Sequence, residues 1–121
     1  MIAMASCPPI GKHCVICVRN IPNAKVLERI ETIKPLLDEI VRMCDLHVVA
    51  EAGHQFEPYG ATYVHVLEES HMSIHTYPET QSCYMDIFCC NHAFEPVTAI
   101  NVIIAWFQIK PTDIEWDVIV R

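Results

Sequence analysis

The chain has 121 residues, enough for one domain with one modest core. Apolar residues make up 52% of it, charged residues 19%, and there are only three glycines, a composition that excludes an intrinsically disordered chain. The formal net charge of −7, with eight scattered Lys and Arg residues, argues against a nucleic-acid partner and suits a cationic small substrate better.

The amino-terminal segment MIAMASCPPIGKHC has no basic region and only a short apolar run, so it does not match a signal peptide. No apolar stretch reaches the ~18–20 residues needed to span a bilayer. We therefore expect a cytoplasmic protein with no membrane partner. In that compartment the seven cysteines predict reduced thiols and not a disulfide framework.

The first third of the chain is predicted to form a strand and then a helix. Residues Lys12–Arg19 are an apolar run rich in Val, Ile and Cys, which is typical of a buried strand. Apolar residues then recur three and four positions apart over 26–44, which predicts an amphipathic helix that begins near the capping residue Asn23. Pro35 lies inside this pattern, and we expect it to kink the helix or split it in two.

Four strand-like runs with short links follow this helix. Two of them flank the turn residues EPYG and two flank PETQS, so antiparallel hairpins are the simplest interpretation. The four runs are Leu46–Phe56, Ala61–Glu68, Ser70–Tyr77 and Cys83–Cys90.

The last third of the chain is predicted to be a helix and a strand. Pro96 is typical of a helix start, and the apolar run Val97–Ile109 is long enough to favour a helix. Pro111 ends it, and Ile114–Val120 alternates as a final strand. The element order predicts an α+β fold, a two-layer sandwich in which one antiparallel β-sheet carries both helices on one face. We expect residues 1–121 to form this single domain.

Reactive polar residues are concentrated in one segment of the chain. His71 and His75 lie four positions apart in a predicted strand and share a face, while Ser70 is expected to point to the other face. A serine, a histidine and a cysteine in one region provide a nucleophile and an acid or base, although such residues in a strand are more often structural. The segment contains Glu68, Glu69, Ser70, His71, His75, Glu79, Cys89, Cys90 and His92.

A zinc site is another possible use of these side chains, with His71, His75, Cys89, Cys90 and His92 as candidate ligands. No C-x-x-C pair is matched by a second pair at a structural-zinc spacing, so we predict no metal site. Cys14 and Cys17 form one such pair within a predicted strand, where residues three apart face opposite sides. We interpret both thiols as core residues.

Several motifs occur in a distinctive order. The segment ESHMSIHTYPE is followed by DIFCC, whose Asp86 lies eleven residues after His75. GKH at residues 11–13 and FEPYGAT at residues 56–62 extend the pattern over most of the chain. This order resembles the short, prokaryotic-type S-adenosylmethionine decarboxylase family, a family of pyruvoyl-dependent enzymes.

The resemblance implies a proenzyme that cuts itself between Glu69 and Ser70, into a β chain of residues 1–69 and an α chain of residues 70–121. In the family the serine attacks the preceding carbonyl, so that the peptide bond becomes an ester. A base, matched here by His75, removes the serine α-proton, and the ester leaves by β-elimination. The dehydroalanine that remains loses ammonia to water and becomes a covalent pyruvoyl group.

The pyruvoyl ketone would form a Schiff base with the substrate amine and act as an electron sink for decarboxylation. Cys90 matches the residue that protonates the carbanion after carbon dioxide leaves. The implied substrate is S-adenosylmethionine, whose decarboxylated form donates aminopropyl groups for spermidine and polyamine biosynthesis. The family also implies a homodimer of processed protomers.

The resemblance assigns four substrate-binding residues. The family holds the adenine between two aromatic rings, matched by Phe56 and Tyr77, and the ribose through a carboxylate, matched by Glu79. Thr62 matches a serine that holds the processing intermediate. The chain departs from the family where Tyr77 replaces a common tryptophan and where TQSCYM, at residues 80–85, replaces a YGYAA-like run. These departures concern substrate identity more than self-cleavage.

Other functions remain open. Relatives with the same core motif act on arginine or ornithine, and Phe56, Tyr77 and Glu79 argue mildly against those substrates, although such rings also occur in ordinary cores. An inactive, unprocessed paralogue that binds a partner is another alternative. Retention of Ser70, His75 and Cys90 together argues against it.

Overall fold

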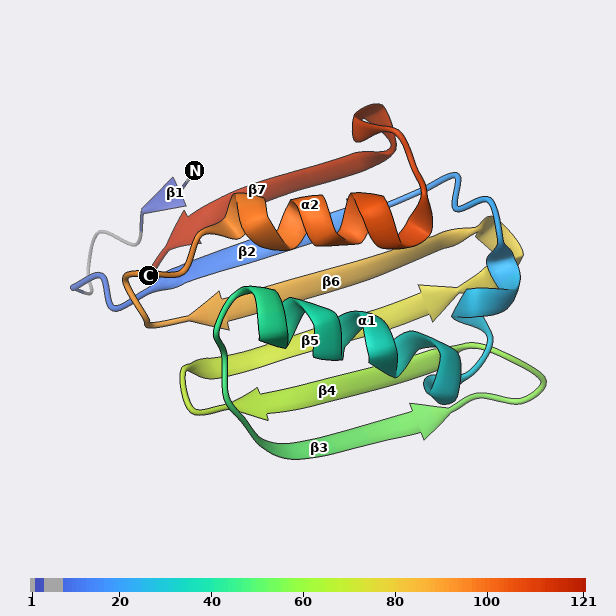
Figure 1. The fold of residues 1–121 in the computed structure, drawn as a ribbon, viewed down its shortest axis with the longest axis horizontal. Helices are drawn as coiled ribbons and strands as arrows, with labels where there is room; N and C mark the ends of the chain where they lie inside the picture. Colours follow the sequence, from blue (N-terminus) through green and yellow to red (C-terminus); the bar gives the residue numbers. More distant parts are fainter. Residues whose placement is uncertain (1, 4–7) are drawn as a thin grey trace.

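The strands of the sheet come from the whole length of the chain. The protein is described by a computed structural model that covers residues 2–3 and 8–121, and in this part of the chain seven strands form one sheet (Figure 1). They are β1 (Ile2–Ala3), β2 (Lys12–Val18), β3 (Val48–Gln55), β4 (Ala61–Leu67), β5 (Ser70–Tyr77), β6 (Ser82–Cys89) and β7 (Ile114–Val120).

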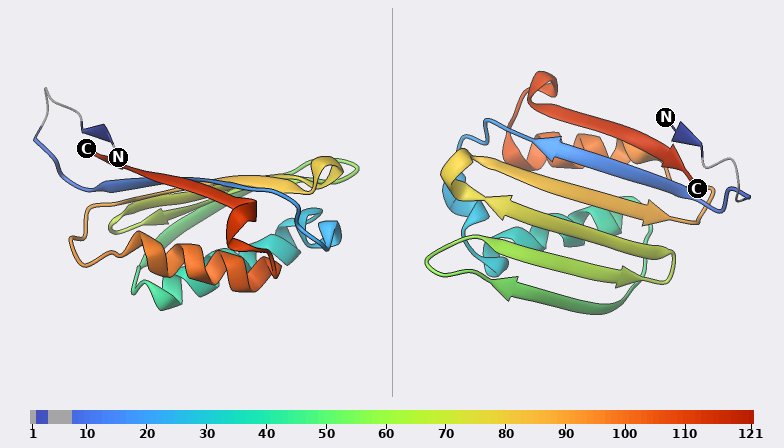
Figure 2. Two further views of the ribbon diagram at one scale, coloured as in Figure 1. Left: turned by 90° about the horizontal axis from the view of Figure 1, so that it is seen from above. Right: turned by 180° about the vertical axis from the view of Figure 1, so that it is seen from behind.

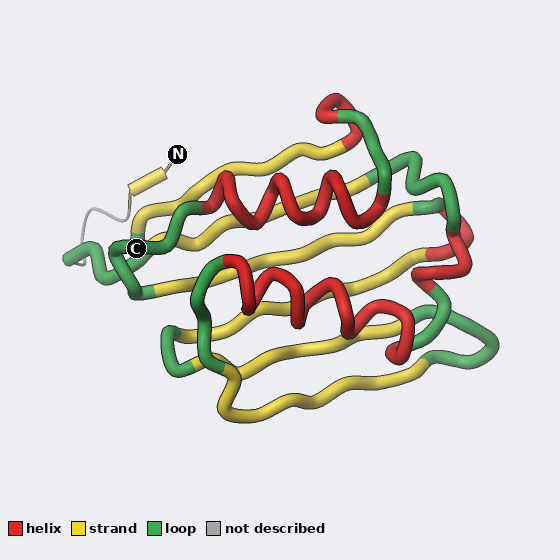
Figure 3. Tube along the Cα trace, viewed as in Figure 1, coloured by secondary structure: helices red, strands yellow, loops and turns green. Residues whose placement is uncertain are grey.

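The strand order in the sheet is β1-β7-β2-β6-β5-β4-β3. Neighbouring strands are antiparallel, apart from β1, which pairs in parallel with β7. Short connections join β3 to β4 and β5 to β6, as the predicted hairpins require (Figure 3). Strand β1 was not predicted, because two residues are too few to show a periodic pattern.

Two α-helices, α1 (Ile30–Met43) and α2 (Pro96–Phe107), lie side by side on one face of the sheet and leave the other face without a helix (Figure 2). Three short 3-10 helices, η1 (Ala24–Leu27), η2 (Pro78–Thr80) and η3 (Pro111–Asp113), lie in the connections. The predicted α+β two-layer sandwich is therefore confirmed. Among the described residues, no helix combines the length and the apolar character needed to cross a membrane.

The break in the first helical region lies before Pro35. Asn23 caps η1, where its side chain accepts a hydrogen bond from the Lys25 N–H at 3.2 Å. The chain is extended at Arg29, and α1 begins at the next residue and continues through Pro35. The predicted split at Pro35 is wrong, because the buried side of α1 offsets the one backbone hydrogen bond that proline removes. That side consists of Ile33, Leu36, Leu37 and Ile40.

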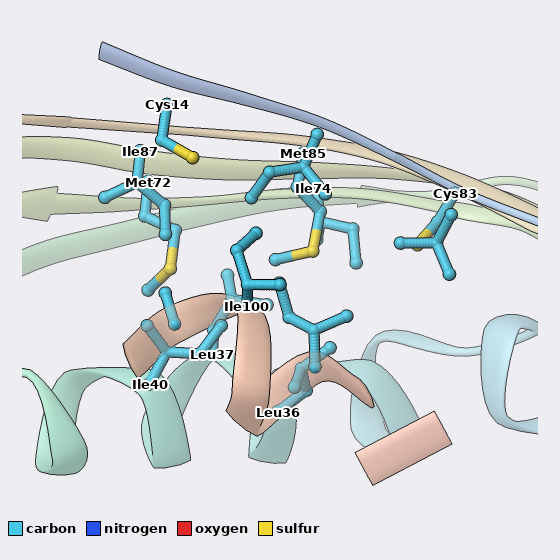
Figure 4. Close-up of a cluster of buried hydrophobic side chains, with 14 of the residues drawn as sticks. Cys14, Leu36, Leu37, Ile40, Met72, Ile74, Cys83, Met85, Ile87 and Ile100 are labelled. Atoms are coloured by element: carbon cyan, nitrogen blue, oxygen red, sulfur yellow. The ribbon is translucent and has the colours of Figure 1, made fainter. Parts of the chain in front are cut away.

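The core lies between the helices and the sheet. Side chains of α1 and α2, including Leu37, Ile40 and Ile100, meet those of β5 and β6, such as Met72 and Ile87 (Figure 4). Alternation along each strand produces this layer, because every second side chain points toward the helices. The opposite set of side chains lies on the face without helices, here called the open face.

The two cysteines of β2 show this alternation. Cys14 is fully buried in the core, and burial raises the pKa of its thiol to about 12. Cys17, three residues later, belongs to the open face and is only partly buried. The prediction that both thiols are core residues is therefore correct for Cys14 and wrong for Cys17, since an odd spacing sends the second side chain to the other face.

Replacing Ile40 by Ala should lower the free energy of unfolding by about 2–5 kcal/mol, because a fully buried side chain leaves a cavity against the sheet. Met43→Ala on the same helix is the control, since that side chain is 49% exposed, and it should cost only about 0.5 kcal/mol. Urea denaturation in a Ser70→Ala background, which keeps the chain in one piece, gives both values. Equal losses would contradict the assignment of the core.

Candidate active site

A pocket of about 250 Å³ lies at the end of β5, beside the turn that joins β3 to β4. It is lined by five residues that the sequence singled out: Phe56, Thr62, His75, Tyr77 and Glu79. A larger hollow of about 540 Å³ lies between α1 and α2, and no motif residue lines it. Because the residues singled out from the sequence line the smaller pocket, we take that pocket as the candidate site.

Strand pairing brings Thr62 and His75 together in this pocket. The two residues are direct partners in the register of β4 and β5, and the Thr62 hydroxyl oxygen is 3.1 Å from Nδ1 of His75. Thr76, between the two site residues of β5, is buried on the helix side. Its hydroxyl donates to the Leu27 carbonyl at 2.7 Å and accepts from the Ala61 N–H at 2.8 Å. These bonds fix the end of β5 against β4 and η1.

The two predicted stacking rings are both half exposed. Phe56 is 47% exposed and Tyr77 is 44% exposed, so ordinary core packing does not explain either of them. The Phe56 N–H donates to the Gly60 carbonyl at 2.9 Å, and Gly60 has a φ of 104°, a conformation that L side chains rarely adopt. Tyr84 was not assigned by motif matching, and its ring lies edge-on to that of Tyr77, with 5.6 Å between the ring centroids.

A second group of predicted residues lies at the opposite end of β5, in the turn from β4. Ser70 begins β5 opposite Cys89 of β6, and the Cys90 N–H donates to the Glu69 carbonyl at 2.9 Å. Cys90 is exposed just beyond β6, whereas Cys89 is buried, and burial raises the pKa of its thiol. Of the two neighbouring thiols, Cys90 is thus the accessible one.

Ser70 has an unusual backbone conformation. Its φ is 146°, a region that residues other than glycine rarely occupy and that costs about 1–3 kcal/mol. Because this departs from regular strand geometry, strand alternation does not determine where the Ser70 side chain points. The expected placement of Ser70 opposite to His71 and His75 stays a prediction, whereas those two histidines do share the open face.

The structure does not bring Ser70 and His75 together within one chain. They are the first and sixth residues of the same strand, which separates them by about 17 Å at 3.4 Å per residue. The predicted catalytic residues therefore form two groups at the two ends of β5. Ser70 lies with Glu69 and Cys90, and His75 lies with the predicted substrate-binding residues.

His47 was not singled out from the sequence, yet it holds Glu69. Its Nδ1 lies 2.7 Å from one carboxylate oxygen, and its backbone N–H donates to the other at 3.1 Å. Partial burial raises the pKa of Glu69, but the hydrogen bonds from His47 outweigh this and leave the pKa below its usual value. The hydrogen bond to Glu69 raises the pKa of His47. No local motif contains both residues, because they are 22 positions apart.

A polar cluster on the open face was also not assigned. Asp86 accepts from His13 at 2.6 Å and from His71 at 3.2 Å, and its other oxygen accepts from the Ser73 hydroxyl. Burial raises the pKa of Asp86, but these hydrogen bonds outweigh it and lower the pKa overall. The motifs GKH and DIFCC were the available signal, because the first contains His13 and the second contains its partner Asp86.

The alternative zinc ligands do not gather. Among the described residues, His71 shares a possible ligand group with His13 and Asp86, and His75 belongs to no such group. The same holds for Cys89, Cys90 and His92 within that part of the chain. The zinc-module interpretation of these ligands therefore has no support in the geometry.

Comparison with known proteins places the chain in a family. The sequence model of the S-adenosylmethionine decarboxylase family matches residues 12–121. The chain is 32% identical to the S-adenosylmethionine decarboxylase proenzyme of Thermodesulfovibrio yellowstonii over 84% of the chain and 74% of that protein. It is 38% identical to the proenzyme of Clostridium botulinum over 71% of the chain and 73% of that protein.

The fold agrees with this assignment. The crystal structure of the adenosylmethionine decarboxylase from Aquifex aeolicus superimposes with a TM-score of 0.82 at 30% sequence identity, over 95% of this chain and 92% of that one. The part of the chain that the family model matches, residues 12–121, includes both groups of predicted residues at the two ends of β5. The chain belongs to the S-adenosylmethionine decarboxylase family.

Proposed function

We propose that the protein is a cytoplasmic, self-processing decarboxylase that converts S-adenosylmethionine to its decarboxylated form for spermidine and polyamine biosynthesis. One observation carries this proposal beyond family membership. Glu69 and Ser70, the proposed cleavage residues, lie in a turn where the Glu69 carbonyl accepts a hydrogen bond and Ser70 is strained. A carbonyl that already accepts a hydrogen bond and a strained residue next to it both favour attack on that carbonyl.

The proposed cut begins with attack of the Ser70 hydroxyl oxygen on the carbonyl carbon of Glu69. The carbon–nitrogen bond breaks, the hydroxyl proton goes to the freed amine, and an ester remains. The Cys90 N–H already donates to the carbonyl oxygen at 2.9 Å, so it can stabilise the negative charge that develops there. Breaking the peptide bond also releases the backbone strain at Ser70.

A base then removes the α-proton of Ser70, the bond between Cβ and Oγ of Ser70 breaks, and Glu69 leaves with that oxygen as a new carboxy-terminal carboxylate. Dehydroalanine remains, and water replaces its nitrogen, which departs as ammonia. A pyruvoyl group at position 70 would supply a ketone that accepts electrons during decarboxylation. The residues around Ser70 fit such a group, because exposed Cys90 lies beside it as a proton donor for the product.

His75 is the proposed base, and two copies of the chain would be needed to use it. About 17 Å separate Ser70 and His75 in one chain, far beyond hydrogen-bond reach. A second copy that packs its open face against the first, in the opposite direction, would bring its pocket to Ser70. The site would then combine Ser70 and Cys90 of one protomer with Thr62 and His75 of its partner.

The open face supports this homodimer. A sheet face that meets only water normally carries polar side chains. Here it carries half-exposed apolar and aromatic side chains, and such faces mark protein interfaces. Val15, Val66, Tyr77 and Tyr84 are 36%, 44%, 44% and 49% exposed.

The pocket suits an adenosyl substrate. Phe56 and Tyr77 offer two half-exposed rings for the adenine, and the Glu79 carboxylate offers an acceptor for ribose hydroxyls. The net charge of −7 favours a sulfonium cation. Arginine and ornithine are the alternative substrates, and neither would need the two rings.

Purified wild-type protein should consist of two chains, residues 1–69 and a blocked chain of residues 70–121. Ser70→Ala should stay a single chain of 13.8 kDa, because it lacks the attacking oxygen. Intact mass spectrometry of the denatured protein distinguishes the two states. A wild-type chain that stays whole after prolonged incubation would overturn the proposed function.

Chains with Ser70→Ala and chains with His75→Ala should each stay uncut when they are expressed alone. When the two are expressed together, the mixed dimer contains one complete site, made from Ser70 of one chain and His75 of the other. A tagged His75→Ala chain should then be cut. If it is cut on its own, His75 is not the base, and if the mixture stays uncut, the shared site is wrong.

Phe56→Ala should raise the KM for S-adenosylmethionine, with a loss of about 1–3 kcal/mol in binding free energy for a base-stacking contact. Self-cleavage should be nearly unchanged, because the ring contributes no group to the acyl shift. Val49→Ala is the matched control, since Val49 is an exposed apolar residue of β3 and does not line the pocket. Release of carbon dioxide from S-adenosylmethionine, arginine and ornithine is measured side by side, and faster turnover of either free amino acid would identify the alternative substrate.

A further inference from the structure

The carboxylate of Glu69 is hydrogen-bonded by His47, a residue that has no part in the proposed chemistry. The His47 backbone N–H and its Nδ1 each contact one carboxylate oxygen, at 3.1 Å and 2.7 Å. Because a carboxylate only accepts hydrogen bonds, Nδ1 must carry a proton. The His47 carbonyl in turn accepts from the Glu68 N–H at 2.9 Å. The residue before β3 thus holds both residues that precede Ser70.

The Glu69 backbone is held from another direction. The Cys90 N–H donates to the Glu69 carbonyl, so the residue that contributes the scissile carbonyl is fixed by donors from two separate segments. The Glu69 side chain is only 12% exposed, which limits competition from water. Its lowered pKa and the raised pKa of His47 favour a charged pair at neutral pH.

The nitrogen side of the scissile peptide is the strained side. Ser70 has its φ of 146°, and such a conformation persists only where the surroundings hold it in place. A turn that is free to move would relax toward an ordinary strand conformation. The hydrogen bonds that hold Glu69, directly before the strained residue, oppose that relaxation.

We infer that His47 is a positioning residue for self-cleavage, which acts through the Glu69 carboxylate to hold the scissile carbonyl where Ser70 attacks it. The inference rests on the proposed self-processing function and adds to it a residue outside the reacting groups. A misplacement of about 1 Å between reacting groups costs a rate on the order of 100-fold. Loss of the His47 side chain should therefore slow cleavage by about tenfold to a hundredfold.

The test measures cleavage by itself and not turnover. Wild-type, His47→Ala and His47→Asn chains are made by pulse-labelled cell-free synthesis, and conversion of the whole chain to its fragments is followed on denaturing gels. His47→Asn should restore the rate to within about threefold of wild type, because its side-chain amide places an N–H donor close to the position of Nδ1. His47→Ala should be the slow variant.

A matched control lies two residues away. The Asp45 side chain is 96% exposed, and its Oδ1 is 3.9 Å from Nε2 of His47, on the side of the ring away from Glu69. Asp45 has a φ of 54°, which asparagine tolerates well, so Asp45→Asn changes the charge and keeps the backbone. It should cleave at the wild-type rate.

A double-mutant cycle tests whether His47 acts through Glu69. Glu69→Ala should slow cleavage, and adding His47→Ala to it should slow cleavage no further, because the contact is already lost. Thermal unfolding of the same His47 variants in a Ser70→Ala background separates positioning from folding, since His47→Ala and His47→Asn should unfold at similar temperatures.

The outcomes distinguish this inference from the proposed function. If wild type never cleaves, both are overturned. If wild type cleaves and His47→Ala cleaves at the same rate, only the role of His47 is overturned. The same holds if the effect of His47→Ala persists in full in the Glu69→Ala chain, or if His47→Asn is as slow as His47→Ala.

Discussion

The register of β5 against its two neighbours determines which side chains meet in this protein. Pairing with β4 sets Thr62 opposite His75, and pairing with β6 sets Ser70 opposite Cys89, directly before Cys90. A slip of one residue would move every side chain of β5 to the other face. The buried row of Met72, Ile74 and Thr76 prevents this, because a slip would exchange it for the histidines of the open face. Core packing thereby positions the polar groups.

The one-sided placement of the helices gives the two faces of the sheet different properties. The covered face contains the apolar core, in which burial keeps thiols such as Cys14 and Cys83 protonated. The open face contains His71, His75 and Asp86, and hydrogen bonds from its neighbours lower the pKa of Asp86 there. One face of the sheet thus contains the dry core, and the other carries titratable side chains among half-exposed apolar ones.

Much of the fold could be predicted from the sequence because each strand buries one face, and alternation is visible in single residues. The start of α1 could not be predicted, because the 3-10 helix η1 and the extended conformation of Arg29 depend on packing against the rest of the fold. The separation of Ser70 and His75 could be predicted, because the two residues are five positions apart in one strand and each position adds about 3.4 Å. The contact of His47 with Glu69 could not be predicted from the spacing, because it depends on the pairing of β3 with β4.

The strand order also bears on what a cut between Glu69 and Ser70 would leave behind. Residues 1–69 contribute β1, β2, β3 and β4, and residues 70–121 contribute β5, β6 and β7. In the sheet, β2 of the first fragment lies between β6 and β7 of the second. The fragments are therefore interleaved, and separating them would break the ladders on both sides of β2, the one between β4 and β5 and the short one between β1 and β7. The cleaved protein would hold together without a covalent link, whereas its renaturation after full unfolding would require two chains to find each other and would depend on their concentration.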